Sequence, residues 1–357
     1  MKNVVFFMGA LTVLSCAFSQ STSKANPAQN GSYDLQSISI SNVSEPTTIN
    51  KSVIDYAATI TQNDLKKLVY SLASDEFEGR KTGEKGQKLA ASYIADFYKN
   101  RSILSATKDG NYMQHIPMEY FRGRSNDSAA NVVAYIKGSE KPNEYIVLSA
   151  HYDHVGIKGN KVYNGADDDA SGTAAVLEIA EAFKMAAENG QGPARTMVFL
   201  HVSGEEIGLF GSKYYTENPI FPLENTVANL NMDMIGRVDD QHENNPEFVY
   251  LIGSNKISNE LHELSEEVNK KYVNLKLDYS YNDDNNPNRS YYRSDHYNFA
   301  KNGIPIIFYF NGVHNDYHKP TDTADKIHYD LLQKRTQLIF YTAWELANRE
   351  NRLKIDE

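Results

Sequence analysis

Two kinds of apolar pattern alternate along the chain and predict its elements. Apolar residues at helical spacing predict helices that begin near Thr61 and cover 84–98, 171–188, 255–272 and 329–350. Short continuous apolar runs predict strands at 132–136, 145–150, 196–202 and 304–310. The run 196–202 is typical of a strand buried on both faces. The alternation predicts an α/β fold, a three-layer α/β/α sandwich around a mixed, mostly parallel sheet.

The first 55 residues do not share this alternation. Lys2 precedes an apolar run from Val4 to Leu14 that is too short to span a membrane, which predicts a signal peptide over 1–19 and export to the periplasm or medium. Residues 20–55 are rich in Ser, Asn, Thr and Gln without periodicity and predict a polar linker or flexible arm. One domain is expected over 56–357. No other stretch predicts a membrane span.

Two processing sites compete at the end of the predicted signal peptide. The small residues Ala17 and Ser19 before Gln20 fit ordinary cleavage. The sequence Val13-Leu14-Ser15-Cys16 also resembles a lipoprotein box, which would make Cys16 a lipid anchor to the membrane. We prefer ordinary cleavage because Leu14 is bulky for its place in that box. Cys16 is the only cysteine, so no internal disulfide can form.

Composition narrows the class of partner. The formal net charge is -10, and Lys and Arg form no cluster, which excludes a protein that binds the phosphate backbone of nucleic acid. An acidic surface suits metals or cationic ligands. Hydrophobic residues make up 41% of 357 residues and are ample for a large core.

Potential metal ligands follow the predicted strands. The candidates stand in five separate stretches: His151, Asp167, the pair Glu205 and Glu206, Asp233, and His318. Because ligands collect beyond the carboxyl ends of strands in open α/β sheets, these side chains are expected around one crevice. One such residue alone is usually structural, but the set matches two zinc ions and one general base.

Six motifs give the chain a family resemblance. In order they are AHYDHVG, NGADDDASG, SGEEIGLFGS, NMDMIGR, YYRSDHYNFAKNGIP and DYHKPTDT. With them, residues 60–345 resemble the co-catalytic di-zinc exopeptidases of the bacterial secreted leucyl aminopeptidase type, relatives of glutamate carboxypeptidase and glutaminyl cyclase. The resemblance implies a zinc-peptidase-like fold of the phosphorylase/hydrolase type, two Zn²⁺ per chain and peptide substrates.

The resemblance also implies a role for each ligand. It makes Asp167 the bridge between both metals, gives His151 and Asp233 to one metal and Glu206 and His318 to the other, and makes Glu205 the general base that activates a water held between the metals. The base assignment agrees with geometry. Adjacent side chains of an extended segment point apart, so Glu205 does not reach the metal that Glu206 binds and is free to move protons.

Further residues are expected around this centre. Asp153, two residues after His151, could accept that ring's other N–H and fix its tautomer. Tyr317 could donate to the oxyanion, or could be one of many packing tyrosines among 24. Asp168 is expected to shape the metal loop, through an unusual peptide bond that the family suggests.

For four further residues the sequence leaves two roles open, contact with the substrate or packing within the protein. Asp295 could orient the substrate or brace the site, and Met234, Tyr291 and Tyr292 are candidate walls of a side-chain pocket or ordinary core residues. We interpret two other histidines of the motifs, His154 and His296, as structural.

The favoured function is an aminopeptidase that cleaves the N-terminal peptide bond. A carboxypeptidase of the same fold is the nearest alternative, because Arg289 and Arg293 could grip a free carboxylate. A glutaminyl cyclase-like acyltransferase would work with one zinc, whereas ligands for two are present. A catalytically dead binding domain would be expected to lack ligands or the base. The preferred residue and the oligomeric state stay open.

Overall fold

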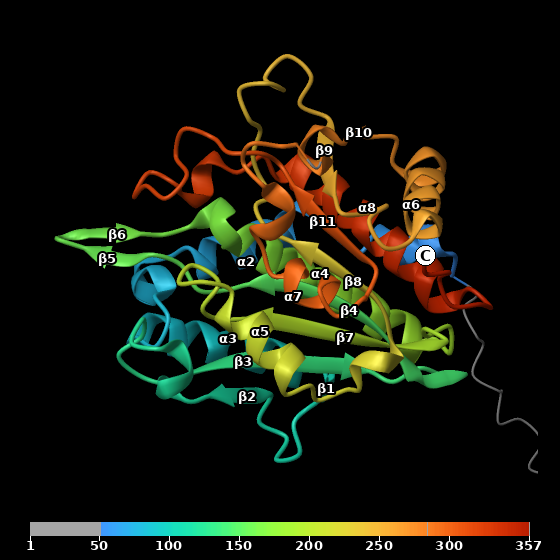
Figure 1. Cartoon of the computed structure of the whole chain (residues 1–357), viewed down its shortest axis with the longest axis horizontal. Helices are drawn as coiled ribbons and strands as arrows, with labels where there is room; N and C mark the ends of the chain where they lie inside the picture. The colour runs from blue at the N-terminus through green and yellow to red at the C-terminus, as the bar shows by residue number, and fades with distance from the viewer. Residues whose placement is uncertain (1–50, 284, 357) are drawn as a thin grey trace, which may run out of the picture. The chain divides into compact units, whose positions relative to one another are not determined.

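Nine strands form one mixed sheet in the computed structural model, which describes residues 51–283 and 285–356. The strand order is β1-β3-β7-β4-β8-β11-β9-β10, and β2 pairs with β3 (Figure 1). The strands are β1 (Leu104–Ser105), β2 (Met113–Ile116), β3 (Ala129–Ile136), β4 (Lys141–His151), β7 (Arg195–Val202), β8 (Thr226–Met232), β9 (Phe248–Ile252), β10 (Lys276–Asp278) and β11 (Ile306–Phe310). A separate hairpin joins β5 (Gly156–Lys158) to β6 (Lys161–Tyr163).

The four central strands β7, β4, β8 and β11 are parallel neighbours. On either side, β3 joins β7 and β9 joins β11 in antiparallel pairs. The predicted mixed sheet is therefore confirmed, with its parallel part concentrated in the centre. All four central strands deliver the residues that follow them to one edge of the sheet.

Helices cover both faces of the sheet (Figure 1). They are α1 (Val53–Ala57), α2 (Gln62–Leu72), α3 (Lys85–Asn100), α4 (Gly172–Glu188), α5 (Phe210–Glu217), α6 (Asn259–Tyr272), α7 (His296–Ala300) and α8 (Tyr329–Asn348). The larger core lies between the sheet and α2, α3, α4, α6 and α8, and a smaller one lies under α5 and α7.

Strand β4 shows how the alternation of side chains builds both cores. Ile146 and Leu148 enter the larger core, whereas Tyr145 and Val147 enter the smaller one. Burial of each such aliphatic side chain stabilises the folded state by about 1.5–3 kcal/mol. Because both faces of β4 are covered, its residues are continuously buried from Tyr145 to His151, where the strand ends.

Capping residues set the helix starts. Thr61 accepts a hydrogen bond from the Asp64 N–H and begins α2, as the sequence predicts. Helix α6 begins at Asn259, later than predicted, because Ser258 caps it by accepting the Leu261 N–H. Ser52 forms a capping box that starts α1 at Val53, inside the stretch assigned to the polar arm.

The predicted signal peptide 1–19, Cys16 and residues 20–50 of the predicted arm lie outside the described residues and stay predictions. Within the described part of the chain, none of the helices has the length and apolar character that crossing a membrane requires.

Candidate metal centre

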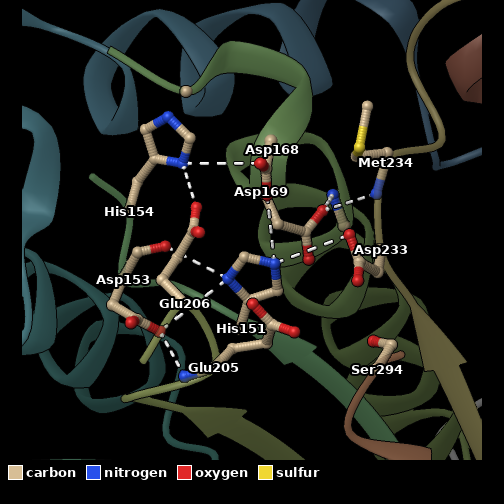
Figure 2. A network of polar contacts seen from close by, with 12 residues as sticks. His151, Asp153, His154, Asp168, Asp169, Glu205, Glu206, Asp233, Met234 and Ser294 are labelled. Atoms are coloured by element: carbon tan, nitrogen blue, oxygen red, sulfur yellow. Dashed lines mark hydrogen bonds and ion pairs between the residues drawn. The ribbon is translucent and has the colours of Figure 1, made fainter. Parts of the chain in front are cut away.

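The candidate ligands meet at the carboxyl edge of the parallel strands. His151 is the last residue of β4, and Asp233 directly follows β8. Glu205 and Glu206 lie on the turn after β7, and His318 lies on the loop after β11. Figure 2 shows Asp233 turned toward His151, and Glu206 turned toward His154. The strand-end argument from the sequence thus places them in one site.

A first group of donors surrounds the His151 ring. Its Nε2 lies 3.2 Å from Asp168 Oδ1 and 3.5 Å from Asp233 Oδ1. Asp169 stands beside them, within 4.8 Å of the same cluster, and its Oδ1 accepts the Met234 N–H. Donor atoms that share one tetrahedral zinc lie roughly 3.3 Å apart, since each is about 2.0 Å from the ion. The spacing around His151 fits such an ion.

A second group surrounds Glu206. Its Oε1 lies 2.7 Å from His154 Nδ1, and its Oε2 lies 3.0 Å from His318 Nε2. Asp168 Oδ2 is 3.1 Å from the same His318 nitrogen and 3.6 Å from the His154 nitrogen. Asp168 therefore presents one oxygen to each group, the position a bridging carboxylate must occupy. The residues present fit two metal ions.

The prediction that Asp167 is the bridge is wrong by one residue. Its Oδ1 accepts the Gly236 N–H at 2.7 Å, and its Oδ2 lies 3.1 Å from His314 Nε2. These contacts turn the Asp167 carboxylate away from His151, and Asp168 takes the central place. The unusual peptide bond expected at Asp168 is present, since the bond from Asp168 to Asp169 is cis.

The loop that carries Asp168 is fastened by residues that sequence reasoning missed. The buried Asp322 carboxylate accepts the N–H groups of Asp167 and Asp168 at 3.0 and 3.2 Å. The buried Arg80 guanidinium donates to the carbonyls of Tyr152 and Gly165. Asp322 shares a motif with His318, which could have drawn attention to it. Arg80 lies outside every motif and had no such signal.

Asp153 anchors the segment of the expected base. Its Oδ1 accepts the Glu205 N–H at 3.2 Å, and its Oδ2 accepts the Thr82 hydroxyl at 2.7 Å. His151 Nδ1 lies 3.1 Å from the Asp153 carbonyl oxygen, whereas the Asp153 carboxylate is 3.8 Å away. Asp153 thus orients the ring through its backbone and positions Glu205 through its side chain.

The Glu205 carboxyl lies at the wall of a cavity of about 990 Å³. Burial raises its pKa well above the ordinary value, and the neighbouring carboxylates of Asp233 and Glu206 raise it further. A carboxyl with a raised pKa is suited to accept a proton and to return it near neutral pH.

Apolar and aromatic side chains form another part of this cavity's wall. Met234 and Tyr292 are among its lining residues, as are Tyr281, Phe308, Phe310 and Val313. Tyr317 also lines the cavity, and its ring stacks on His318 at 3.9 Å between centroids. Burial and the surrounding acids raise the pKa of Tyr317, so its phenol keeps its proton and can donate it.

Two predicted substrate residues lie away from the cavity wall. Asp295 is fully buried, where its Oδ1 accepts the Ser212 hydroxyl at 2.5 Å, and burial raises its pKa to about 7. This position fits bracing rather than substrate contact. The Tyr291 ring packs edge-on against His296, and its carbonyl oxygen lies 2.8 Å from His296 Nε2. That contact, with the ring of His296 stacked on Phe308, agrees with a structural role for His296.

The interpretation of His154 as a satisfied structural histidine is wrong. Its ring is buried, and neither ring nitrogen has a hydrogen-bond partner. Its Nδ1 instead joins Asp168 and Glu206 in a cluster able to hold a metal.

Comparison with known proteins agrees with this geometry. A "Probable zinc metalloprotease" of Pyricularia oryzae is 39% identical over 113 residues, 30% of this chain and 21% of the relative. A "Glutamate carboxypeptidase 2 homolog" of Caenorhabditis elegans is 41% identical over 107 residues, 29% of this chain and 13% of the relative. The chain thus spans a minor part of the length of these relatives.

The fold also matches a solved structure. The Legionella pneumophila LapA aminopeptidase superposes with a TM-score of 0.65 at 20% identity, over 84% of this chain and 75% of that one. The model of peptidase family M28 matches residues 131–343, more than half of the chain and all of the strands that deliver the donors. The chain therefore belongs to peptidase family M28.

Proposed function

We propose that the protein is a di-zinc aminopeptidase that hydrolyses the N-terminal peptide bond of peptides. One observation carries the proposal: Asp168 presents an oxygen to each of two donor groups, and Glu205 lines the cavity beside them without belonging to either group. His151 and Asp233 would hold one zinc, and Glu206 and His318 the other. When bound, zinc supplies Lewis acidity that polarises a carbonyl and acidifies water.

Three residues of the chain have separate roles in hydrolysis. Glu205 takes the proton of the attacking water and delivers it to the leaving amine. The Tyr317 phenol donates a hydrogen bond to the carbonyl oxygen as it gains negative charge. Asp153 keeps Glu205 in place through the Glu205 N–H.

Charge supports an amino end as the group bound beside the metals. The polar end of the cavity carries the acids Glu205, Glu206 and Asp233, which attract a protonated amine. The apolar wall around Met234 and Phe308 suits a large apolar first side chain. The match to a solved aminopeptidase is a further argument for this specificity.

An assay of aminoacyl amides with free and with blocked amino groups tests this function. We expect hydrolysis of the free amides only, loss of activity with a chelator and recovery with zinc. Hydrolysis of the blocked amides at a comparable rate would contradict the proposal, and so would activity that resists complete removal of metal.

A carboxypeptidase is the second candidate, because Arg124 and Arg293 both line the cavity and could bind a free carboxylate. The predicted Arg289 is not among the lining residues; its guanidinium lies over the Tyr292 ring. Peptides blocked at the amino end but free at the carboxyl end distinguish the two. If these are the substrates, Arg124→Ala and Arg293→Ala should raise their KM.

A further inference from the structure

We propose that His154 is an additional protein ligand of the metal held by Glu206 and His318, which closes that metal's coordination. The inference rests on the proposed di-zinc function and goes beyond it. It makes the two metal positions unequal. The position beside His151 keeps room for water and substrate, and the position beside His154 is filled by protein.

The first argument is a set of buried atoms without hydrogen-bond partners. His154 Nδ1, Glu206 Oε1 and Asp168 Oδ2 each lack one, although the first two lie only 2.7 Å apart. Leaving such an atom unsatisfied destabilises the fold, and buried polar groups are rarely left so. A cation between them satisfies all three at once, because each then directs a lone pair at the metal.

The second argument is the spacing of four donors. Glu206 Oε2 and Asp168 Oδ2 lie 3.0 and 3.1 Å from His318 Nε2. Glu206 Oε1 and the same Asp168 oxygen lie 2.7 and 3.6 Å from His154 Nδ1. These values scatter around the roughly 3.3 Å edge of a zinc tetrahedron. Two imidazole nitrogens and two carboxylate oxygens are a donor set that zinc accepts.

The third argument is that the His154 ring is held in place without a polar partner of its own. A Cβ at Gly165 would lie 2.6 Å from the ring atoms Cγ and Cδ2, so the ring fits closely against the glycine. Gly165 has a φ of +57°, and its carbonyl accepts from Arg80. The His154 N–H also donates to the Arg80 carbonyl. The ring therefore aims Nδ1 at Glu206 from a fixed position.

The donors around His151 differ in kind. His151 Nδ1 lies 3.1 Å from the Asp153 carbonyl oxygen, which leaves Nε2 for a metal shared with Asp168 and Asp233. Asp169 lies within 4.8 Å of His151 and Asp233, but its Oδ1 already accepts the Gly172 and Met234 N–H groups, so we count three ligands for this metal. Three protein ligands with an open position are typical of catalytic zinc, and four are typical of structural zinc. Glu205 lies beside this three-ligand group, where a proton acceptor is needed.

The test uses the full chain labelled with ¹⁵N-histidine and loaded with ¹¹³Cd²⁺. We expect scalar coupling between cadmium and three imidazole nitrogens, from His151, His318 and His154. In His154→Ala one coupling disappears. Zinc competition with a chelator should then show that one of the two sites binds zinc at least about tenfold more weakly than in the unmodified chain, since partners one step further from a metal already contribute about 10–100-fold.

His201→Ala is the matched control, because His201 is equally buried and its Nε2 bonds to the Tyr98 hydroxyl instead. It should keep three couplings and both zinc affinities. Two bound metals with only two coupled histidines in the unmodified chain would overturn the inference and leave the proposed function standing. Fewer than two bound metals would overturn both. The unmodified chain decides the question even if His154→Ala does not fold.

Discussion

Two acid-rich cavities of this molecule differ in what their acids face. At the carboxyl edge of the sheet, the ion-pair partners of Asp168, Glu206 and Asp233 are histidines. In a second cavity of about 360 Å³, between α2, α3 and α4, acids alternate with cations. There Lys67 pairs with Asp64 at 2.8 Å. Arg101, on the rim, pairs with Glu181 at 2.6 Å.

The difference shows that the count of acids alone does not identify a metal site. In and beside the second cavity, Asp64 and Glu181 each have a lysine or an arginine of the protein as partner, so these two carboxylates need no further cation. At the sheet edge, histidines alternate with carboxylates around points that no protein cation occupies, which is the donor pattern of zinc. Substitutions at the sheet edge should therefore change metal binding and activity, whereas a substitution in the second cavity should change only stability.

Asp168→Asn should have the largest effect, because Asp168 serves both donor groups. We expect both metals to be lost and hydrolysis to fall by at least about 10³-fold, since metal catalysis supplies several kcal/mol. The control is Asp167→Asn, which should keep both metals and lose about 1–3 kcal/mol of unfolding free energy from its contacts with Gly236 and His314. If Asp167→Asn lost both metals and Asp168→Asn kept them, Asp167 would be the bridging residue.

Glu205→Gln should lower kcat by about 10²–10⁴-fold while metal content stays unchanged, because the amide cannot accept the proton. Metal analysis and steady-state kinetics measure the two effects separately. The neighbouring Glu206→Gln is the comparison, since it should loosen one metal. Loss of metal from Glu205→Gln would show that Glu205 is a ligand.

Tyr317→Phe should lower kcat by about 10²-fold if the phenol donates to the developing oxyanion, with KM and metal content little changed. Tyr292→Phe is the matched control, because Tyr292 lines the same cavity with its ring exposed. An unchanged kcat in Tyr317→Phe would reduce Tyr317 to a ring that packs on His318.

Glu178→Gln in the second cavity should leave activity unchanged and alter only the pH dependence of stability. Burial, together with the nearby acids Glu181 and Asp64, raises the pKa of Glu178 to about 8. Between pH 5 and 8 the folded state therefore binds more protons at this group than the unfolded state, so stability falls as pH rises. The wild type should lose roughly 3 kcal/mol from this group over that range, which Glu178→Gln does not lose.

Urea unfolding of the zinc-loaded protein at several pH values measures this. Glu188→Gln, at the exposed end of the same helix, is the control and should keep the wild-type slope. If Glu178→Gln also keeps that slope, the buried carboxyl does not control it.

The sequence predicts the long elements well and the short ones poorly. Helices α2, α3, α4 and α8 follow from apolar periodicity because each buries one broad face over many turns. Helix α5 has eight residues, and β10 has three. Both are too short for a period to show, and their conformation depends on the neighbours that they pack against.

Strand ends and motif order lead to the edge of the sheet where the candidate residues meet, but they do not choose among three consecutive acids. Which of Asp167, Asp168 and Asp169 faces both donor groups depends on Gly236 and Asp322, which are distant in sequence and hold the first of the three turned away. The surroundings of the His154 ring are not predicted for the same reason. Its partner Glu206 lies on a different strand end, and periodicity carries no information about that contact.

Stepwise addition of zinc to the chelator-stripped chain tests the central claim most directly. Bound metal and hydrolysis of a free aminoacyl amide are followed together at each zinc-to-protein ratio. If Asp168 bridges two zinc positions, binding should saturate at two zinc ions per chain, and full activity should be reached only at that ratio. Saturation of binding and activity at one zinc ion, or full activity in the stripped chain, would contradict it.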